Sequence, residues 1–326
     1  MIRVGLVGSG KIALEYARVI DSFNHKIEVI VTKNKSRSKK TLIRKYKIQN
    51  EIDDFESALK KFPQIDFWII CNATEYLVQN LKIAIKYKVK FLIEKSILIK
   101  SKNIKKITNN LKEHEIENFF VAYNRNFYDF IIQLIQILKN DAPKKIIINM
   151  ADPFTQIIKK RGIKFKRNLV KFMTSHWIAL ILKILENLNY KIQFKSITKF
   201  FSKGYLGYKF LYFKVKKSKK EILINFNLIP DNPSNTSISF YGKKNIILSP
   251  IEKIHINSGI KKKMINNQNI YVPIVNSKKT SDKFKPGFKL MYKSFFEKVL
   301  NKKKNNQLVN IKDLVKIYSI CEIFEE

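Results

Sequence analysis

The sequence predicts an α/β fold: an N-terminal Rossmann domain with a doubly wound parallel sheet, followed by an α+β domain with an open, mainly antiparallel sheet. Three observations predict it. Apolar strand-like runs alternate with helix-period segments over the first 120 residues, a pattern typical of parallel sheets with helical crossovers. A glycine-rich turn follows the first run. From about residue 191, strand-like runs succeed one another directly, which indicates hairpins and an antiparallel sheet.

The first domain is expected over residues 1–122. Its strands are short, apolar runs: Ile2–Val7, Lys26–Val31, the start of Ile52–Leu59, Phe67–Cys71, Lys90–Ile93 and Phe119–Tyr123. Segments with apolar residues at helical spacing lie between them: Lys11–Ile20, Ser38–Tyr46, the rest of Ile52–Leu59, Glu75–Tyr87 and Ile104–His114. Because helices follow strands, right-handed crossovers are expected to cover both faces of the sheet.

The second domain is expected over residues 123–326. Its predicted helices are Phe127–Lys139, Thr174–Leu188, Phe288–Leu300 and Ile311–Phe324. Its predicted strands are Lys145–Met150, Ile192–Phe200, Tyr208–Val215, Glu221–Leu228, Ser237–Tyr241 and Asn245–Leu248. Turns are expected at Gly204 and Ser218–Lys219, and an irregular stretch at Arg161–Arg167. The change of rhythm near residue 122 therefore predicts the domain boundary.

Charge is the outlying feature of the composition. The formal net charge is +38, from 64 Lys and Arg against 26 Asp and Glu. Only seven of the basic residues are Arg, and the lysines are spread over the whole chain. Readers of bases and phosphates favour Arg for its bidentate fork. Aromatic residues interleave with lysines over Phe200–Lys214, but at strand spacing this is more simply one face of a sheet. The composition therefore predicts no specific nucleic-acid partner.

Cysteine use and hydropathy indicate the compartment. The two cysteines, Cys71 and Cys321, form no disulfide framework and no metal-binding spacing, as expected in a reducing compartment. No run reaches the roughly 18 apolar residues of a membrane span, and the N-terminal run is interrupted at once by glycines and charges. We expect a cytoplasmic protein with no membrane association and no metal.

The glycine-rich turn has the pattern G-x-G-x-x-A. It comprises Gly8, Ser9, Gly10, Lys11, Ile12 and Ala13. The glycines suit a tight turn and the approach of a pyrophosphate to the backbone, and the following helix offers free N–H groups. The position at the first βα turn favours a dinucleotide site over the alternative, an ordinary strand-to-helix turn.

The end of the second predicted strand bears on which dinucleotide binds. An NAD site usually places an acid there, about 20 residues past the loop, on the ribose 2′-hydroxyl. This chain has Thr32, Lys33 and Arg37 in that region and no acid between them. A hydroxyl with two cations suits a 2′-phosphate, so NADP is favoured over NAD. A solvated basic loop is an equally good interpretation.

Two further motifs carry a family resemblance. Glu94-Lys95-Ser96 ends a buried strand, and Asn124-Arg125-Asn126-Phe127 follows the last strand of the first domain. With the glycine loop, they resemble the glucose–fructose oxidoreductase / inositol dehydrogenase (Gfo/Idh/MocA) family, whose strand end is Glu-Lys-Pro and whose second domain opens near Asn-Arg-Arg-Phe. Lys285-Pro286-Gly287-Phe288 also resembles a stretch of sugar-related members. The resemblance extends over the whole chain.

The resemblance implies that Lys95 is catalytic, touching the reacting hydroxyl beside the nicotinamide, while Glu94 helps to hold the lysine and the cofactor. The position is chemically suitable, because open α/β sheets bind ligands at the carboxyl ends of their strands. An ammonium there stabilises a developing alkoxide. The alternative is one lysine among many at a strand end, and Ser96 replaces the family's proline.

The family's second catalytic element is Asp-x-x-x-His-x-x-Asp. Here His176 matches the general-base histidine, whereas Phe172 and Ala179 stand where aspartates are usual. Imidazole accepts a proton near neutral pH, and its orientation would have to come from another group, with Thr174 or Ser175 as weak candidates. The alternatives are a core or capping role for His176 and a member without catalytic activity.

The remaining candidates concern the pocket walls. Asn72, Ala73 and Thr74 match a cofactor-lining stretch of the family, although Glu75 replaces its proline. Asn124 and Arg125 are candidate substrate ligands. Arg161, with Arg167 and Lys164, is a candidate clamp for an anionic substrate, or else part of a solvated loop.

The sequence therefore predicts an NAD(P)-dependent oxidoreductase that transfers hydride between nicotinamide and a hydroxyl or carbonyl of a sugar or nucleotide-sugar. The resemblance suggests surface-polysaccharide synthesis and a homo-oligomer, a dimer or tetramer. Two alternatives remain: a non-catalytic member that binds cofactor or sugar, and a polyanion-binding protein supported by net charge alone.

Overall fold

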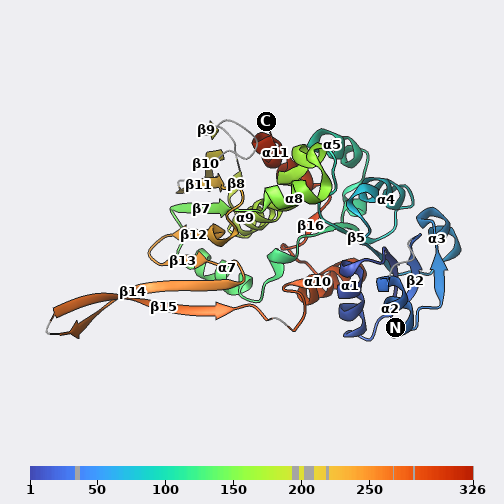
Figure 1. Ribbon diagram of the computed structural model, residues 1–326, viewed down its shortest axis with the longest axis horizontal. Coiled ribbons are helices and arrows are strands. Elements are labelled where there is room, and N and C mark those ends of the chain that lie inside the picture. The colour runs from blue at the N-terminus through green and yellow to red at the C-terminus, as the bar shows by residue number, and fades with distance from the viewer. Residues whose placement is uncertain are drawn as a thin grey trace.

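A computed structural model describes residues 1–33, 37–192, 198–201, 209–217, 220–266, 268–281 and 283–325. Its architecture confirms the predicted fold class. A largely parallel sheet covered by helices is followed by a second, mostly antiparallel sheet with its own helices, and the two lie side by side (Figure 1).

The first sheet, sheet A, has the strand order β16-β6-β5-β4-β1-β2-β3. Strands β1 to β6 pair in parallel. Their bounds are β1 Arg3–Val7, β2 Lys26–Val31, β3 Asn50–Ile52, β4 Phe67–Ile70, β5 Phe91–Glu94 and β6 Phe119–Ala122. Except in the edge strand β3, most of their side chains are buried on both faces, as parallel strands under helices require.

Helices cover both faces of sheet A. They are α1 Lys11–Asp21, α2 Arg37–Tyr46, α3 Phe55–Lys61, α4 Thr74–Lys86, α5 Ser101–Asn109 and α6 Glu113–Ile116. Helix α1 packs with α10, Phe288–Asn301, against one face, where Tyr16, Phe67 and Phe295 share a core cluster. On the other face, α3, α4 and α5 bury residues that continue into the core of the second sheet.

Two elements from late in the chain complete sheet A. Strand β16, Val309–Asn310, pairs antiparallel with β6, and α10 lies beside α1 (Figure 1). Helix α10 was predicted, but its packing against sheet A was not. Strand β16 was not predicted, because the sequence gives no sign of a two-residue strand. The domain boundary at residue 122 stays a prediction.

The second sheet, sheet B, has the order β15-β14-β13-β12-β7-β11-β10-β8, and β9 pairs with β10. Its bounds are β7 Lys145–Met150, β8 Lys191–Ile192, β9 Thr198–Phe201, β10 Lys209–Lys217, β11 Lys220–Leu228, β12 Ser237–Tyr241, β13 Asn245–Leu248, β14 Lys253–Ile265 and β15 Gln268–Lys279. All of these pairs are antiparallel except β7 with β11. The turns predicted at Gly204 and Ser218–Lys219, and residues 193–197 of a predicted strand, lie outside the described residues.

Helices α7 Ile131–Asn140, α8 Phe154–Arg161, α9 Ser175–Asn187 and α11 Asp313–Glu325 accompany sheet B. The 3₁₀ segments η1 Asn124–Phe127, η2 Ile163–Asn168 and η4 Pro233–Asn235 join them, and η3, Val170–Thr174, is a π-helical turn that leads into α9. Helix α8 was missed because Phe154 is its one buried residue, so the segment shows little apolar periodicity.

Strands β14 and β15 form a long hairpin that projects from the body of the protein (Figure 1). The sequence analysis did not predict this hairpin. Beyond Asn257, most of its side chains are exposed, so neither strand shows the alternation of apolar and polar residues that marks a half-buried strand. No helix among the described residues combines the length and apolarity that crossing a bilayer requires.

Candidate active site

The glycine loop lies between β1 and α1, at the carboxyl edge of sheet A. Gly8 has φ of +116°, and a Cβ there would lie 2.7 Å from the backbone nitrogen of Asn72. Only glycine meets both requirements without strain. A Cβ on Gly10 would meet no atom within 4 Å, so the loop is open at that position.

Helix α1 begins after Gly10 without a side-chain cap. Its first N–H groups therefore have no partner within the helix, and the macrodipole places partial positive charge beside them. An open glycine surface and an uncapped helix N-terminus together fit a pyrophosphate. Residues Gly8 to Ala13 thus fit the dinucleotide of the expected cofactor.

The end of β2 contacts the glycine loop. The hydroxyls of Ser9 and Thr32 are hydrogen-bonded at 2.9 Å, and both residues are buried. Lys33 is exposed beside them. Arg37 begins α2, but its side chain lies outside the described part of the structure. The preference for NADP therefore stays a prediction.

The ends of β4 and β5 supply the next wall. Asn72 follows β4, and its Oδ1 is buried without a hydrogen-bond partner among the described residues. Ala73 is the N-cap of α4, and Thr74 is its buried first residue. Glu94, at the end of β5, accepts a 2.8 Å hydrogen bond from the hydroxyl of Tyr16 on α1. Burial raises the pKa of Glu94, and the Tyr16 hydrogen bond opposes the rise.

Lys95 reaches across from sheet A to the second half of the molecule. Its Nζ donates a 2.6 Å hydrogen bond to the backbone carbonyl of Phe172, and the hydroxyl of Ser96 donates to the same oxygen at 2.8 Å. Burial lowers the pKa of Lys95 to about 8, with Glu94 opposing and the positive charge of Arg125 adding to the fall. A readily deprotonated ammonium at a strand end is chemically suited to a proton-transfer site.

His176 lies in the first turn of α9, after the π-helical turn. Its side chain is buried, and Nδ1 has no hydrogen-bond partner among the described residues. The ring of Tyr123 meets the imidazole edge-to-face, with centroids 5.5 Å apart. Burial lowers the pKa of His176 well below its usual value, and the positive charges of Lys95 and Arg125 lower it further. The imidazole is therefore neutral and can accept a proton.

The expected orienting groups do not contact His176. Thr174 donates instead to the carboxylate of Asp152 at 2.9 Å, and Ser175 donates to the carbonyl of Lys171 at 2.7 Å. Both hydroxyls therefore hold the backbone of the turn and make no hydrogen bond to the imidazole, which corrects the expectation from the sequence.

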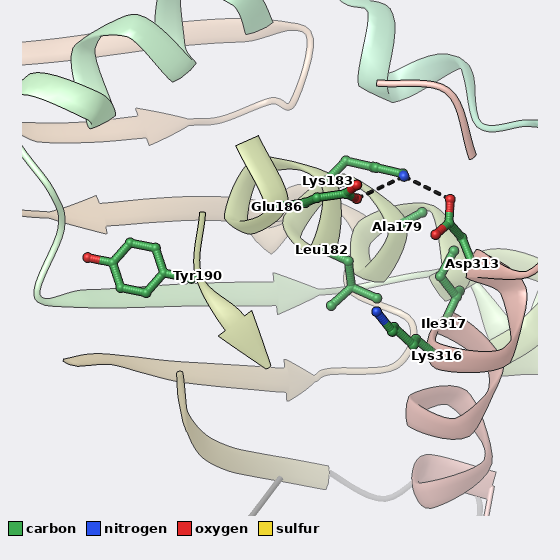
Figure 2. Close-up of a pocket in the computed structure, with 8 residues that line it drawn as sticks. All are labelled: Ala179, Leu182, Lys183, Glu186, Tyr190, Asp313, Lys316 and Ile317. Carbon is green, nitrogen blue, oxygen red and sulfur yellow. Dashed lines mark hydrogen bonds and ion pairs between the residues drawn. The ribbon is translucent and has the colours of Figure 1, made fainter. Parts of the chain in front are cut away.

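Phe172 and Ala179, at the positions of the family aspartates, have different surroundings. The Phe172 ring packs under Arg161, whose guanidinium lies 4.7 Å from the ring centroid. Ala179 lines a cavity of about 280 Å³ between α9 and α11. Figure 2 shows Lys183 there, paired with Glu186 and Asp313. The lining of this cavity includes neither Lys95 nor His176, so it is separate from the candidate active site.

Asn124 and Arg125 occupy η1, at the junction of the two halves. The amide of Asn124 donates to the carbonyl of Pro286 at 2.8 Å, so this side chain holds the Lys285–Phe288 loop. Gly287 is required there, because a Cβ would lie 2.0 Å from the Asn124 carbonyl oxygen. Arg125 stacks on Trp177 at 3.9 Å, and its Nη1 is buried without a hydrogen-bond partner among the described residues. A buried, unpaired N–H is a suitable donor to a ligand oxygen.

Arg161 is engaged by protein groups. It pairs with Glu75 of α4 at 2.7 Å and stacks on Phe165 as well as Phe172. It thus bridges α8 and α4. Lys164 and Arg167 are exposed on η2, so the structure does not gather the three cations into one clamp.

Three further residues act on this region. The sequence analysis did not identify Tyr16, which contacts Glu94, or Asp152, a buried acid whose pKa responds to Lys95 and Arg125. It named Lys285 for the resemblance alone, and this residue acts electrostatically on both Lys95 and His176. Asp152 had one detectable signal, since it follows the predicted strand Lys145–Met150.

Comparisons with known proteins agree with this geometry. Residues 2–123 match the family model GFO_IDH_MocA, described as an oxidoreductase family with an NAD-binding Rossmann fold. No curated protein matches the sequence.

Solved structures match over the length of the chain. A dehydrogenase from Chromobacterium violaceum has a TM-score of 0.74 at 12% identity, covering 99% of this chain and 94% of that one. UDP-N-acetylglucosamine 3-dehydrogenase from Acidithiobacillus ferrooxidans has a TM-score of 0.70 at 10% identity, covering 100% and 99%. A dehydrogenase from Clostridium difficile has a TM-score of 0.65 at 17% identity, covering 99% and 98%. At these identities the likeness shows a shared fold.

The glycine loop, the strand-end residues and the matched residues 2–123 lead to one conclusion. Residues 2–123 carry the NAD-binding Rossmann fold of the GFO_IDH_MocA oxidoreductase family, and the whole chain shares the fold of the solved dehydrogenases.

Proposed function

We propose that the protein is an NAD(P)-dependent oxidoreductase acting on a hydroxyl or carbonyl group of a sugar or nucleotide-sugar. The convergence of Lys95 and His176 from different halves of the molecule carries this proposal. Lys95 donates to the carbonyl of Phe172, in the turn that leads into His176, and its positive charge lowers the pKa of the imidazole. When bound, the nicotinamide supplies the hydride acceptor or donor.

The two side chains have complementary roles in oxidation of an alcohol. Neutral His176 accepts the hydroxyl proton, and the ammonium of Lys95 donates a hydrogen bond to the oxygen as it becomes a carbonyl. In reduction, the protonated imidazole returns the proton. Lys95 already donates to the Phe172 carbonyl, but an ammonium has three N–H donors, so a substrate oxygen can share it with that carbonyl.

Other residues are assigned to binding. Gly8 to Ala13 would hold the pyrophosphate, and Asn72, Ala73, Thr74 and Glu94 would line the nicotinamide half. Thr32, Lys33 and Arg37 favour a 2′-phosphate and therefore NADP. Arg125 would donate its buried N–H to the substrate. Asn124 and Arg161 would act indirectly. Asn124 holds the loop at Pro286, and Arg161 pairs with Glu75 of α4.

The substrate class rests on resemblance. One solved structure of the same fold is a UDP-N-acetylglucosamine 3-dehydrogenase, which supports a nucleotide-sugar substrate. A place in surface-polysaccharide synthesis rests on the family resemblance alone. We also propose that the protein is cytoplasmic and forms a homo-oligomer. Its two domains would comprise residues 1–122 and 123–326. The two free cysteines, both buried, are compatible with a reducing compartment.

A second candidate function is cofactor or sugar binding without catalysis. The hydrogen bond from Lys95 to the protein's own backbone favours it, as does the absence of acids at positions 172 and 179.

The test is a fluorescence titration with NADH and NADPH, followed by turnover with UDP-N-acetylglucosamine and a panel of sugars and polyols. We expect tighter binding of NADPH, and a loss of roughly 100- to 10,000-fold in kcat/KM for Lys95→Gln with cofactor affinity retained. Lys82→Gln, on the exposed side of α4, is the matched control. Binding of neither nucleotide would contradict the proposal. Binding without turnover on the whole panel would favour the second candidate.

A further inference from the structure

The second half of the candidate site lacks the acids expected near His176, but a carboxylate reaches this region from another element. Asp152 follows β7 and is 5% exposed. Its Oδ2 accepts the 2.9 Å hydrogen bond from Thr174. Thr174 ends the π-helical turn and stands two residues before His176. The carboxylate therefore anchors the turn that also presents the Phe172 carbonyl to Lys95.

The backbone of Asp152 is itself held. Its carbonyl accepts hydrogen bonds from the amides of Phe154, at 2.9 Å, and Asp231, at 3.0 Å. These bonds fix where β7 ends. The side chain thus projects from a defined point, as required of a group that positions its neighbours.

The charges around Asp152 connect it with Lys95. Burial raises the pKa of Asp152, and the positive charges of Arg125 and Lys95 oppose the rise together with the Thr174 hydroxyl. The Trp177 indole opposes it as well, although its N–H makes no hydrogen bond of normal geometry. These attractions favour the charged form of Asp152, but burial outweighs them and the pKa of Asp152 stays above its usual value.

The charged groups that act on the pKa of Lys95 show what the Asp152 carboxylate contributes. Glu94 and Asp152 favour the ammonium, whereas Arg125 and Lys285 disfavour it. Neutral His176 adds no charge. Glu94 also accepts the hydrogen bond from Tyr16. Without Asp152, Glu94 would be the one acid of this set left to balance the positive charges.

We propose that Asp152 is a positioning residue for the reaction: it supplies, from the end of β7, a carboxylate that the His176 motif lacks, and it acts on Lys95 through charge and on the His176 turn through Thr174. This inference rests on the proposed function for its catalytic meaning. The link between Asp152 and Lys95 is measurable without turnover.

The experiment separates charge from hydrogen bonding. The protein is labelled with ¹³C at lysine Cε, the Lys95 signal is identified by its loss in Lys95→Gln, and its pKa is followed by NMR. Asp152→Asn removes the charge but keeps an acceptor for Thr174. Thr174→Val removes the donor and keeps the charge. Asp129→Asn is the matched control, because exposed Asp129 accepts a similar bond from Thr280 at 3.1 Å and does not act on Lys95.

We expect Asp152→Asn to lower the pKa of Lys95 by about 0.5 to 1 unit from its value near 8. Thr174→Val and Asp129→Asn should leave it within about 0.2 units, since both keep the charge at residue 152. Asp152→Glu should restore the wild-type value. If Asp152→Asn does not fold, Asp152→Ser takes its place as the uncharged variant.

An unchanged Lys95 pKa in the uncharged variant would overturn the proposal. Where turnover is found, the alkaline limb of the kcat/KM profile should move to lower pH in Asp152→Asn and stay in place in Thr174→Val, while kcat falls in both. A protein that binds no nicotinamide cofactor would defeat the proposed function and leave the Lys95 titration interpretable on its own.

Discussion

The two sides of the candidate active site are built in different ways. On the sheet A side, the glycine loop presents backbone: Gly8 is forced by close approach to Asn72, and Gly10 is left open. On the sheet B side, the π-helical turn Val170–Thr174 presents side chains and one carbonyl, held by groups from several elements. The first side follows a short sequence motif, whereas the second depends on residues far apart in the chain.

Two residues that depart from the expected family pattern meet at this second side. Ser96 stands where proline was expected, and its φ of +72° is one that proline cannot adopt. Its hydroxyl donates to the backbone carbonyl of Phe172, a residue that stands where aspartate was expected. Because any residue supplies that carbonyl, the contact does not explain the phenylalanine.

The largest expected effect concerns the backbone-built side. Gly8→Ala places a Cβ 2.7 Å from the Asn72 nitrogen in a conformation that L residues rarely adopt. We expect a loss of roughly 2 to 4 kcal/mol in the free energy of unfolding, measured by urea denaturation. A loss below about 1 kcal/mol would show that the loop tolerates side chains and would weaken the contrast between the two sides.

Gly10→Ala sharpens the same contrast, with a smaller effect on stability. Its Cβ enters open space, so the free energy of unfolding should change by less than about 1 kcal/mol. The methyl group would nevertheless occupy the surface where a pyrophosphate approaches the backbone. NADPH affinity, measured by fluorescence, should fall about tenfold or more, equivalent to about 1.4 kcal/mol. Unchanged affinity would argue against a phosphate at this loop.

The smallest expected effect concerns the side-chain-built side and depends on pH. The folded-state pKa of His176 lies well below the usual 6.5. Below pH 6.5 the unfolded chain binds a proton that the folded chain does not, so stability falls as the pH drops toward the folded-state pKa. The slope from this group is at most about 1.4 kcal/mol per pH unit.

Urea unfolding at pH 7.5 and pH 5 checks this effect. His176→Gln should lose less stability between the two values than the wild type, whereas exposed His114→Gln should behave like the wild type. Equal losses in His176→Gln and the wild type would mean that the imidazole is solvated, and that the second side is less enclosed than the structure indicates.

The fold was predictable where burial is complete. Strands β1, β2 and β4 to β6 are apolar on both faces, and helices of regular period separate them, so their sequence pattern is unambiguous. Hairpin β14–β15 was missed because lysines and asparagines occupy much of it. Its two strands hydrogen-bond to each other but bury few side chains, so no alternation of apolar and polar residues marks them in the sequence.

The site was predictable to the extent that it follows motifs. Lys95 and His176 do converge, and their assignment as catalytic residues stays a prediction. The hydrogen bond from Asn124 to Pro286 joins residues 162 positions apart, and the hydrogen bond from Thr174 to Asp152 joins residues 22 positions apart. Such contacts arise from tertiary packing, which no local pattern encodes.

The return of α10 and β16 to sheet A has a consequence for biosynthesis. Residues 288–310 bury Phe67 and Phe120 on one face of the sheet and extend its edge at β6. A ribosome-bound chain that has exposed only the first six strands therefore leaves aromatic side chains uncovered. We therefore expect the Rossmann half to complete its packing only after residue 310 has emerged, and to expose apolar surface until then.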